Sequence, residues 1–245
     1  MTKLILHGHK LSPCVRSVLI VAEAIGLTDD QLKFNLINLF NSEHLTKEFL
    51  SMNPVHSVPV LECDEGYIID SHAITTYLVT KYAKNDKLYP KDPFKRALVD
   101  QRLHFDSGIL YIRLRNVSMG IYHDKSTEIP KERIDTVYEG FEFMEKFLEN
   151  DLYLAGNSLT LADLQCVCTV TSCFGFAPIS EERFPKLFNW LKRMYELPYY
   201  ERGNGIENLA YVNFLKDTLR KKKEAQMKGS GFNIFHFNDH SELNS

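Results

Sequence analysis

The residues best placed to do chemistry are Ser12, Pro13 and Cys14, which lie between a short predicted strand at 3–7 and a predicted helix. Proteins that exchange dithiols carry a Cys-x-x-Cys pair at such a turn, but Ser12 and Val15 occupy the two cysteine positions here. Dithiol exchange is therefore disfavoured. Ser12 can simply be a helix N-cap before Pro13. It can also act on a ligand, because a hydroxyl beside free N–H groups at a helix N-terminus binds a thiolate and lowers the thiol pKa.

The second interpretation of Ser12 is energetically sufficient. A free thiol titrates near ~8.5, so keeping it ionised at neutral pH requires a pKa decrease of roughly two units, or about 2.7 kcal/mol. One hydrogen bond to a charged group contributes about 1.5–3 kcal/mol. A helix N-terminus adds about 0.3–1 kcal/mol. Together these two contributions can ionise a bound thiol without a general base.

His56-Ser57-Val58-Pro59 precedes an apolar run that predicts a strand. A proline at this position fits a tight turn with a cis Val58-Pro59 bond, which leaves the backbone N–H and C=O of Val58 free for an extended peptide ligand. The alternative is an ordinary proline turn.

Asp70-Ser71-His72 opens another predicted helix, with Ser71 as the natural N-cap. Capping alone can explain this serine. A binding interpretation instead places a ligand carboxylate on Ser71 and the helix N–H groups, with Asp70 facing an ammonium group. Together, these three sites would suit a γ-glutamyl peptide that carries a thiol. Ser12 would bind the thiol, Val58 would pair with the peptide backbone, and Asp70 with Ser71 would bind the charged γ-glutamyl end.

The elements that must position these residues alternate in the first third of the chain. A helix begins at Pro13, carries a periodic apolar face and ends before Gly26. The other predicted elements are strands at 34–37, 58–63 and 67–69, a short helix at 43–52 and a helix from Ser71. This order predicts a small mixed sheet with helices on both sides, at residues 1–83.

The remainder of the chain predicts only helices. A polar linker at 84–93 precedes periodic segments at 94–122, 131–149, 161–175, 184–196 and 207–223, and residues 224–245 form a C-terminal extension. Thr160 and Asp163 have the spacing of a capping box, with Leu159 and Leu164 as its hydrophobic staple. The fold class is therefore an α/β domain followed by an all-α domain at 94–223.

Composition excludes several classes of function. The chain has 245 residues and a net charge of −3, which argues against nucleic-acid binding. Its five cysteines form no disulfide framework or zinc motif, so a reduced, cytoplasmic protein is expected. The first residues lack the apolar span of a signal peptide, and no run reaches membrane-spanning length.

The four motifs together resemble the glutathione transferases. These motifs are Ser12-Pro13, Asn53-Pro54-x-His56-Ser57-Val58-Pro59, Asp70-Ser71-His72-Ala73-Ile74 and Leu159-Thr160-Leu161-Ala162-Asp163, and they cover roughly residues 1–220. Their details are similar to the insect Delta and Epsilon classes, and closer to Epsilon. The resemblance implies a thioredoxin-like N-terminal domain, an all-α C-terminal domain, a homodimer and glutathione as co-substrate, with no metal. The expected activity is conjugation of glutathione to hydrophobic electrophiles, as in detoxification of xenobiotics.

The resemblance also implies a role for individual positions. Ser12 would activate the glutathione sulfur. The implied glutathione-binding residues are Pro13, His44, His56, Ser57, Val58, Pro59, Asp70, Ser71, His72 and Arg115. Of these, His44 and His56 would hold the glycine carboxylate, and Asp70 and Ser71 the γ-glutamyl end. Whether Arg113 or Arg115 faces the site is left open by the sequence.

A second substrate would lie between the domains. The candidate walls of its apolar pocket are Leu11, Phe40, Tyr111, Leu114, Ser118, Met119, Tyr122 and His123. Several of these residues could instead belong to the core.

Two features depart from the family pattern and keep other functions open. Cys14 places a thiol at the first turn of a helix, where a depressed pKa is expected. The extension beyond about residue 220 carries an aromatic cluster (Phe232, Phe235 and Phe237) that could cover the pocket. Two alternatives therefore remain: a non-catalytic or biosynthetic binder of glutathione and an apolar ligand such as a steroid, and a Cys14-dependent thiol transferase.

Overall fold

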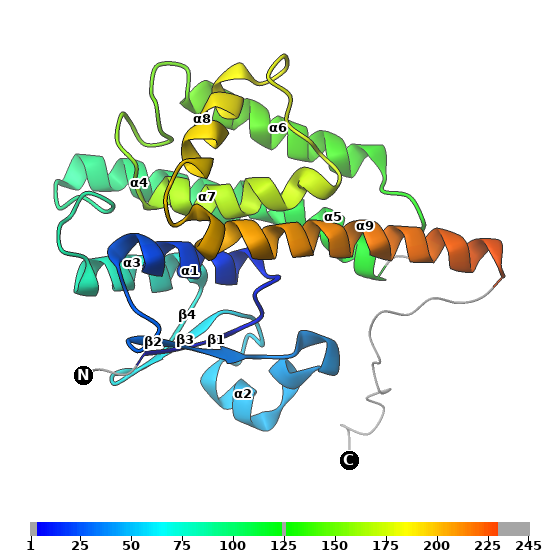
Figure 1. Cartoon of the computed structure of the whole chain (residues 1–245), viewed down its shortest axis with the longest axis horizontal. Helices are drawn as coiled ribbons and strands as arrows, with labels where there is room; N and C mark the ends of the chain where they lie inside the picture. The colour runs from blue at the N-terminus through cyan, green and yellow to red at the C-terminus, as the bar shows by residue number, and fades with distance from the viewer. Residues whose placement is uncertain (1–3, 124–125, 230–245) are drawn as a thin grey trace.

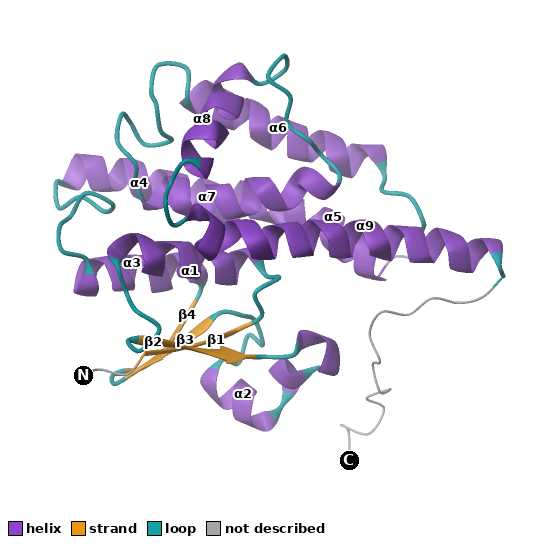
Figure 2. Cartoon of the chain, viewed as in Figure 1, coloured by secondary structure: helices purple, strands orange, loops and turns teal. Residues whose placement is uncertain are grey.

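The computed structural model describes residues 4–123 and 126–229 (Figure 1). The aromatic cluster at Phe232, Phe235 and Phe237 lies outside the described residues, so its expected contact with the pocket stays a prediction. The N-terminal part is a small sheet covered by helices, and the C-terminal part consists of helices, as the sequence predicts (Figure 2).

The N-terminal elements follow the predicted order. They are β1 (Leu4–Gly8), α1 (Pro13–Ile25), β2 (Leu32–Leu36), α2 (Lys47–Met52), β3 (Val60–Cys63), β4 (Gly66–Ile69) and α3 (Ser71–Tyr82). The strand order is β2-β1-β3-β4, with β1 and β2 parallel and the other pairs antiparallel. The helices α1 and α3 lie on one face of this mixed sheet, and α2 lies on the other (Figure 2).

Successive side chains of β1 point to opposite faces of the sheet, and apolar or buried residues on both faces require helices on both sides. Leu4 and Leu6 are buried against Val15, Val18 and Ile74 of the two covering helices. His7 follows Leu6 and points to the opposite face, where it is also buried and contacts Glu62 of β3 through Nε2 at 2.9 Å. The end of α1 is also as predicted, because Gly26 adopts a left-handed conformation (φ 76°) that closes the helix.

Several predicted elements differ in extent from the structure. The strand predicted at 58–63 begins at Val60, and the helix predicted to end at 223 continues to Met227, within the predicted extension at 224–245. The strand predicted at 34–37 begins two residues earlier, in parallel register with β1. The helix predicted at 43–52 is interrupted, because Thr46 caps α2 after a 3₁₀ turn at Glu43–Leu45. The long helix predicted at 94–122 is α4 (Pro93–Phe105) and α5 (Tyr111–His123), joined by a π-helical turn, η3 (Asp106–Leu110).

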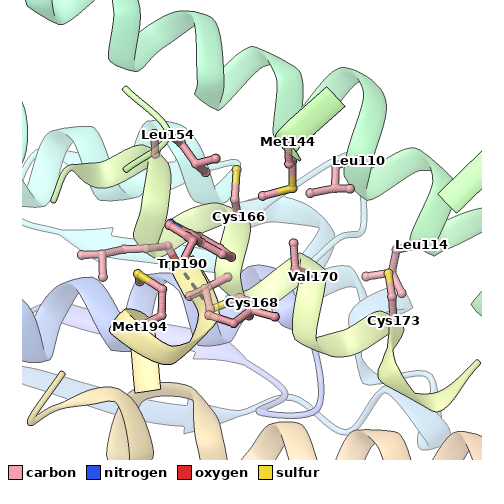
Figure 3. Close-up of a cluster of buried hydrophobic side chains, with 14 of the residues drawn as sticks. Leu110, Leu114, Met144, Leu154, Cys166, Cys168, Val170, Cys173, Trp190 and Met194 are labelled. Atoms are coloured by element: carbon pink, nitrogen blue, oxygen red, sulfur yellow. Dashed lines mark hydrogen bonds between the residues drawn. The ribbon is translucent and has the colours of Figure 1, made fainter. Parts of the chain in front are cut away.

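The remaining helices enclose the core of the C-terminal part. They are α6 (Lys131–Phe147), α7 (Leu161–Ser172), α8 (Pro185–Tyr195) and α9 (Ile206–Met227), and a π-helical turn, η5 (Glu201–Gly205), precedes α9. Every residue of α7 is buried, and this helix runs through the middle of the bundle (Figure 1). Around it, Trp190 and Met194 of α8, Met144 of α6 and Leu110 of η3 converge on Cys166 and Val170 (Figure 3).

The predicted capping box at the start of α7 is confirmed. The Asp163 carboxylate accepts hydrogen bonds from Thr160 N at 2.9 Å and Leu154 N at 2.9 Å. It also accepts one from Trp190 Nε1 at 2.9 Å. This fully buried side chain therefore connects the cap to α8 and to the preceding loop. Within residues 4–123 and 126–229, none of the helices has the length and apolarity needed to cross a membrane.

Candidate functional site

A cavity of about 660 Å³ lies between the sheet-bearing part and the helices α5 and α9. Its floor contains Ser12, Pro13 and the turn before β3, and its opposite wall comes from the two helices. The residues around it are His9, Leu11, Ser12, Pro13, Leu39, Phe40, His44, Val55, His56, Ser57, Val58, Tyr111, Leu114, Arg115, Ser118, Met119, Tyr122, His123, Tyr211 and Phe214.

Ser12 occupies the N-cap position of α1, but its side chain makes no capping hydrogen bond. Its backbone carbonyl accepts from Val15 N and Arg16 N, both at 3.1 Å, and its N–H donates to His9 O at 2.8 Å. Pro13 at the first helical position needs no acceptor. The Ser12 hydroxyl is thus held at the rim of a helix N-terminus without being used by that helix. This arrangement suits hydrogen bonding to an anion in the cavity.

The turn before β3 has the predicted cis Val58-Pro59 bond. Buried Asn53 shapes this turn: its Nδ2 donates to Ser57 O at 2.7 Å, and its Oδ1 accepts from Val55 N at 2.9 Å. Val58 borders the cavity, whereas Pro59 does not. The backbone of Val58 is therefore presented at the edge of the space in which a peptide would lie.

Two histidines stand at one end of the cavity. The rings of His44 and His56 are 6.4 Å apart between centroids, and both border the cavity. Burial, and secondarily the neighbouring His56, lowers the pKa of His44. Nδ1 of His44 is buried and has no hydrogen-bond partner among the described residues. An incoming hydrogen-bonding group would satisfy that atom.

The start of α3 differs from the prediction, because Asp70 and not Ser71 is the N-cap. Oδ1 of Asp70 accepts from His72 N at 2.9 Å and from Ala73 N at 3.1 Å, and its backbone has φ 73°. Ser71 is the first helical residue and is buried. Neither residue borders the cavity, although the Asp70 side chain is 60% exposed. The carboxylate remains accessible from solvent beside the cavity.

His72 does not face the cavity but forms a buried contact beneath Asp70. Its Nε2 donates to Asp106 Oδ2 at 2.9 Å, and its Nδ1 is 3.5 Å from Asp70 Oδ1. Burial disfavours the charged ring, but the hydrogen bond to Asp106 and the nearby carboxylate of Asp70 outweigh it and raise the pKa of His72 to about 9. At neutral pH, His72 is therefore a cation that connects Asp70 to η3.

The expected depression of the Cys14 pKa is wrong. Burial raises the pKa of this thiol to about 11, despite a hydrogen bond with the Tyr111 side chain. Cys14 does not border the cavity. A helix N-terminus lowers a thiol pKa only where the thiolate is solvated or paired, and here the protein packed around the sulfur disfavours the charged form.

All eight residues predicted to form the apolar pocket border the cavity: six come from α5, and Leu11 and Phe40 come from the sheet-bearing part. Phe40 contacts His9 and Phe214 in edge-to-face geometry, with centroids 5.5 and 5.4 Å apart. Phe214 also lies 5.9 Å from the ring of Tyr122. These contacts form a continuous aromatic surface along one side of the cavity.

The open question about the two arginines is resolved by α5. Arg115 borders the cavity, whereas Arg113 forms an ion pair with Glu139 of α6. Two positions apart on a helix are about 200° apart around its axis, so the two side chains face opposite directions. Of the two arginines, Arg115 is therefore the one within reach of a ligand.

Five cavity residues were not predicted: His9, Leu39, Val55, Tyr211 and Phe214. Tyr211 and Phe214 are three positions apart on α9, a spacing that indicates one helical face but not what that face covers. His9 is three residues before Ser12, and this proximity in sequence could have suggested it. Among the described residues, no group of three or more His, Cys, Asp or Glu side chains could hold a metal ion.

Comparisons with known proteins agree with this architecture. Residues 6–86 match the family model for the glutathione S-transferase N-terminal domain, and residues 109–198 match that for the C-terminal domain. The chain is 42% identical to glutathione S-transferase 1 of Manduca sexta over 218 residues, which are 89% of this chain and 97% of that protein.

Two solved structures are also similar. An epsilon-class glutathione S-transferase from the housefly, Musca domestica, is 45% identical with a TM-score of 0.85, over 88% of this chain and 98% of that one. A glutathione transferase homolog from Drosophila mojavensis, solved with bound glutathione, is 40% identical with a TM-score of 0.82, over 91% and 98% of the two chains.

Proposed function

The chain belongs to the glutathione S-transferase family and is an enzyme that conjugates glutathione, and we propose that the Ser12 hydroxyl stabilises the glutathione thiolate that attacks an apolar electrophile. The observation that carries this proposal is the Ser12 side chain, which borders the cavity and makes no capping bond to its own helix. In the reaction, the sulfur lone pair forms the new S–C bond. The leaving group departs with the electrons of the broken bond.

The tripeptide would lie along the floor of the cavity. Its cysteinyl backbone would pair with the N–H and C=O of Val58, which the cis Pro59 turn presents, and its sulfur would lie at Ser12 and Pro13. The glycine carboxylate would bind near His44, His56 and Ser57. Support for this direction comes from the unpartnered Nδ1 of His44 at that end.

The γ-glutamyl end would bind at the start of α3. Asp70 would accept the ammonium group, and the hydroxyl and N–H of Ser71 would bind the carboxylate, because the next two helical N–H groups already donate to Asp70. His72 would act indirectly, because its contacts with Asp70 and Asp106 fix the carboxylate that meets the ligand. Arg115 would contact the peptide or the second substrate from α5.

The second substrate would be an apolar electrophile, which is consistent with a role in detoxification of xenobiotics. The aromatic surface formed by Phe40, Tyr122 and Phe214 favours flat or aromatic compounds, because edge-to-face and stacked contacts add to the burial of apolar area. All five cysteines are free thiols, which supports a reducing compartment such as the cytoplasm.

We also propose a homodimer. Ile109 of η3 and Ile112 of α5 are 38% and 46% exposed on a face that does not border the cavity. A two-fold contact between copies of this face would bury them. Sedimentation analysis should show twice the mass of one chain, and a monomer would contradict the proposal.

The two alternatives predict different behaviour. A thiol transferase acting through Cys14 requires an accessible, ionisable thiol, and the raised pKa of Cys14 argues against it. A non-catalytic carrier would bind glutathione and an apolar ligand without ionising the thiol.

The Ser12→Ala variant tests the proposed function. Losing one hydrogen bond to a thiolate should raise the pKa of bound glutathione by about one to two units. The conjugation rate near neutral pH should then fall roughly tenfold or more, while glutathione affinity changes little. Ser51→Ala, at an exposed serine of α2, is the matched control. Unchanged conjugation and an unchanged thiolate pKa in Ser12→Ala would overturn the assignment.

A further inference from the structure

Arg16 is fully buried, which is unusual for an arginine. It lies on α1, one turn after Ser12, and its guanidinium points into the junction of α1, α7 and α9. A buried cation is normally paired with a carboxylate, since removing a charge from water is unfavourable by several kcal/mol. No carboxylate of residues 4–123 and 126–229 forms an ion pair with Arg16.

Neutral oxygens satisfy the guanidinium instead. Nε donates to Asn204 Oδ1 at 2.8 Å, and Nη2 donates to Asn208 Oδ1 at 3.0 Å and to the Ser172 hydroxyl. The Tyr211 ring lies 5.4 Å from Cζ. These acceptors hold the guanidinium group in place, but because they are uncharged they do not neutralise its positive charge.

The last donor, Nη1, reaches the loop that carries Ser12. It donates to Leu11 O at 2.6 Å and to Lys10 O at 3.3 Å. The Leu11 oxygen and the Ser12 Cα belong to one planar peptide, so Nη1 lies within about 5–6 Å of that Cα. The same cation therefore holds the backbone of the loop that carries Ser12 in its conformation. It also lies close to the point where a bound thiolate would form.

We propose that Arg16 is a positioning residue for the thiolate step: its unneutralised guanidinium fixes the loop that carries Ser12 and supplies the positive charge that the glutathione sulfur anion balances. The inference rests on the proposed function of Ser12. It adds a second, electrostatic contribution that acts through the protein and not by contact with the sulfur. A charge kept away from water acts over a longer distance than an exposed one.

Other titratable groups face the same region and must be considered. Around Arg16 they are Cys14, Cys168, Tyr200 and Tyr211, and around the cavity they are His9, His44, His56, Arg115 and His123. The carboxylate of Glu207 is paired with Lys10 at 3.7 Å. Burial raises the pKa of the four groups around Arg16, so none of them is anionic at neutral pH. The carboxylates of Asp106 and Asp70 act on Cys14, but in the described part of the chain both contact His72 and neither forms an ion pair with Arg16.

Asn204→Asp tests the charge of Arg16 without removing its hydrogen bonds. The substitution keeps the shape of the side chain and the bond from Nε, while giving the guanidinium a carboxylate partner. The amide of Asn204 donates to the hydroxyls of Thr171 and Tyr200, both at 3.1 Å. Hydroxyl groups can reverse direction, so Tyr200 can donate to the new carboxylate. The melting temperature is expected to stay the same or rise.

The decisive readout is the pKa of bound glutathione, followed by the ultraviolet absorbance of its thiolate. We expect Asn204→Asp to raise it by about one unit, with a roughly tenfold lower conjugation rate below that pKa and a glutathione KM within about twofold of the parent. Asn208→Asp, which places a carboxylate at Nη2, should act in the same direction. Asn116→Asp adds the same charge on an exposed position of α5 and should shift nothing.

The outcomes separate the inference from the function on which it rests. If Ser12→Ala raises the thiolate pKa but a folded Asn204→Asp or Asn208→Asp enzyme does not, the role of the Arg16 charge is overturned and the role of Ser12 stands. If Ser12→Ala also leaves the pKa unchanged, the proposed function fails. A purely structural Arg16 would change the melting temperature in these variants but not the titration of the bound thiol.

Discussion

Replacement of His72 by glutamine should remove a pH-dependent part of the stability of this enzyme. In the folded protein, contacts with Asp106 and Asp70 raise the pKa of His72 to about 9, above the ~6.5 of an unperturbed histidine. A folded-state pKa above the unfolded value means that the charged ring stabilises the fold fully below pH ~6.5. This stabilisation is lost as pH rises to about 9.

The expected magnitude follows from that difference. A pKa difference of about 2.5 corresponds to about 3 kcal/mol, and the His72 side chain is only 15% exposed, so solvent screens little of it. The glutamine side chain would be uncharged at every pH. The difference in unfolding free energy between the parent and His72→Gln should therefore fall by about 3 kcal/mol between about pH 6 and pH 9.5.

Trp190 provides the assay, because it is the single tryptophan of the chain and is fully buried. Urea unfolding of both proteins would be followed by its fluorescence at a series of pH values. The protein concentration must be constant, since association contributes to apparent stability. Taking the difference between the two proteins cancels the titration of all other groups. A difference that stays constant over this pH range would refute the reasoning about His72 and Asp106.

Two further predictions follow from single contacts. Asp163→Ala leaves the buried donors Leu154 N, Thr160 N and Trp190 Nε1 without their acceptor, so we expect a loss of about 3–5 kcal/mol in urea unfolding; a loss below about 1 kcal/mol would contradict this account. Phe214→Ala removes part of the aromatic surface, so it should weaken conjugation of flat aromatic electrophiles several-fold while leaving the KM for glutathione unchanged. Equal effects on aromatic and small aliphatic electrophiles would contradict the second prediction.

Local patterns were sufficient to predict several features that the structure shows. Ser12 at the start of α1, the cis Val58-Pro59 turn and the capping box at Thr160 each depend on residues that are neighbours in the sequence. The periodic stripe of α5 likewise contained all of its predicted cavity residues. Short-range signals of this kind survive folding because the responsible contacts are within one turn.

Features that depend on tertiary contacts were missed or predicted wrongly. Nothing in the local pattern shows that Arg16 is buried, because its acceptors are up to 192 positions away. The direction of the Cys14 pKa was wrong because packing around the sulfur outweighs the helix N-terminus. Asp70, not Ser71, caps α3, since a left-handed backbone at Asp70 turns its carboxylate onto the helix N–H groups.

The π-helical turn at Asp106–Leu110 has a consequence for how this enzyme can change over evolutionary time. Such a turn contains one residue more than an α-helical turn, so every position after it is rotated by about 100° relative to an uninterrupted helix. Deleting Gly108 would merge α4 and α5 and rotate Tyr111, Leu114 and Ser118 away from the cavity. A change in the length of this segment would thus alter several cavity-lining residues of α5 in a single step, which no point substitution could achieve.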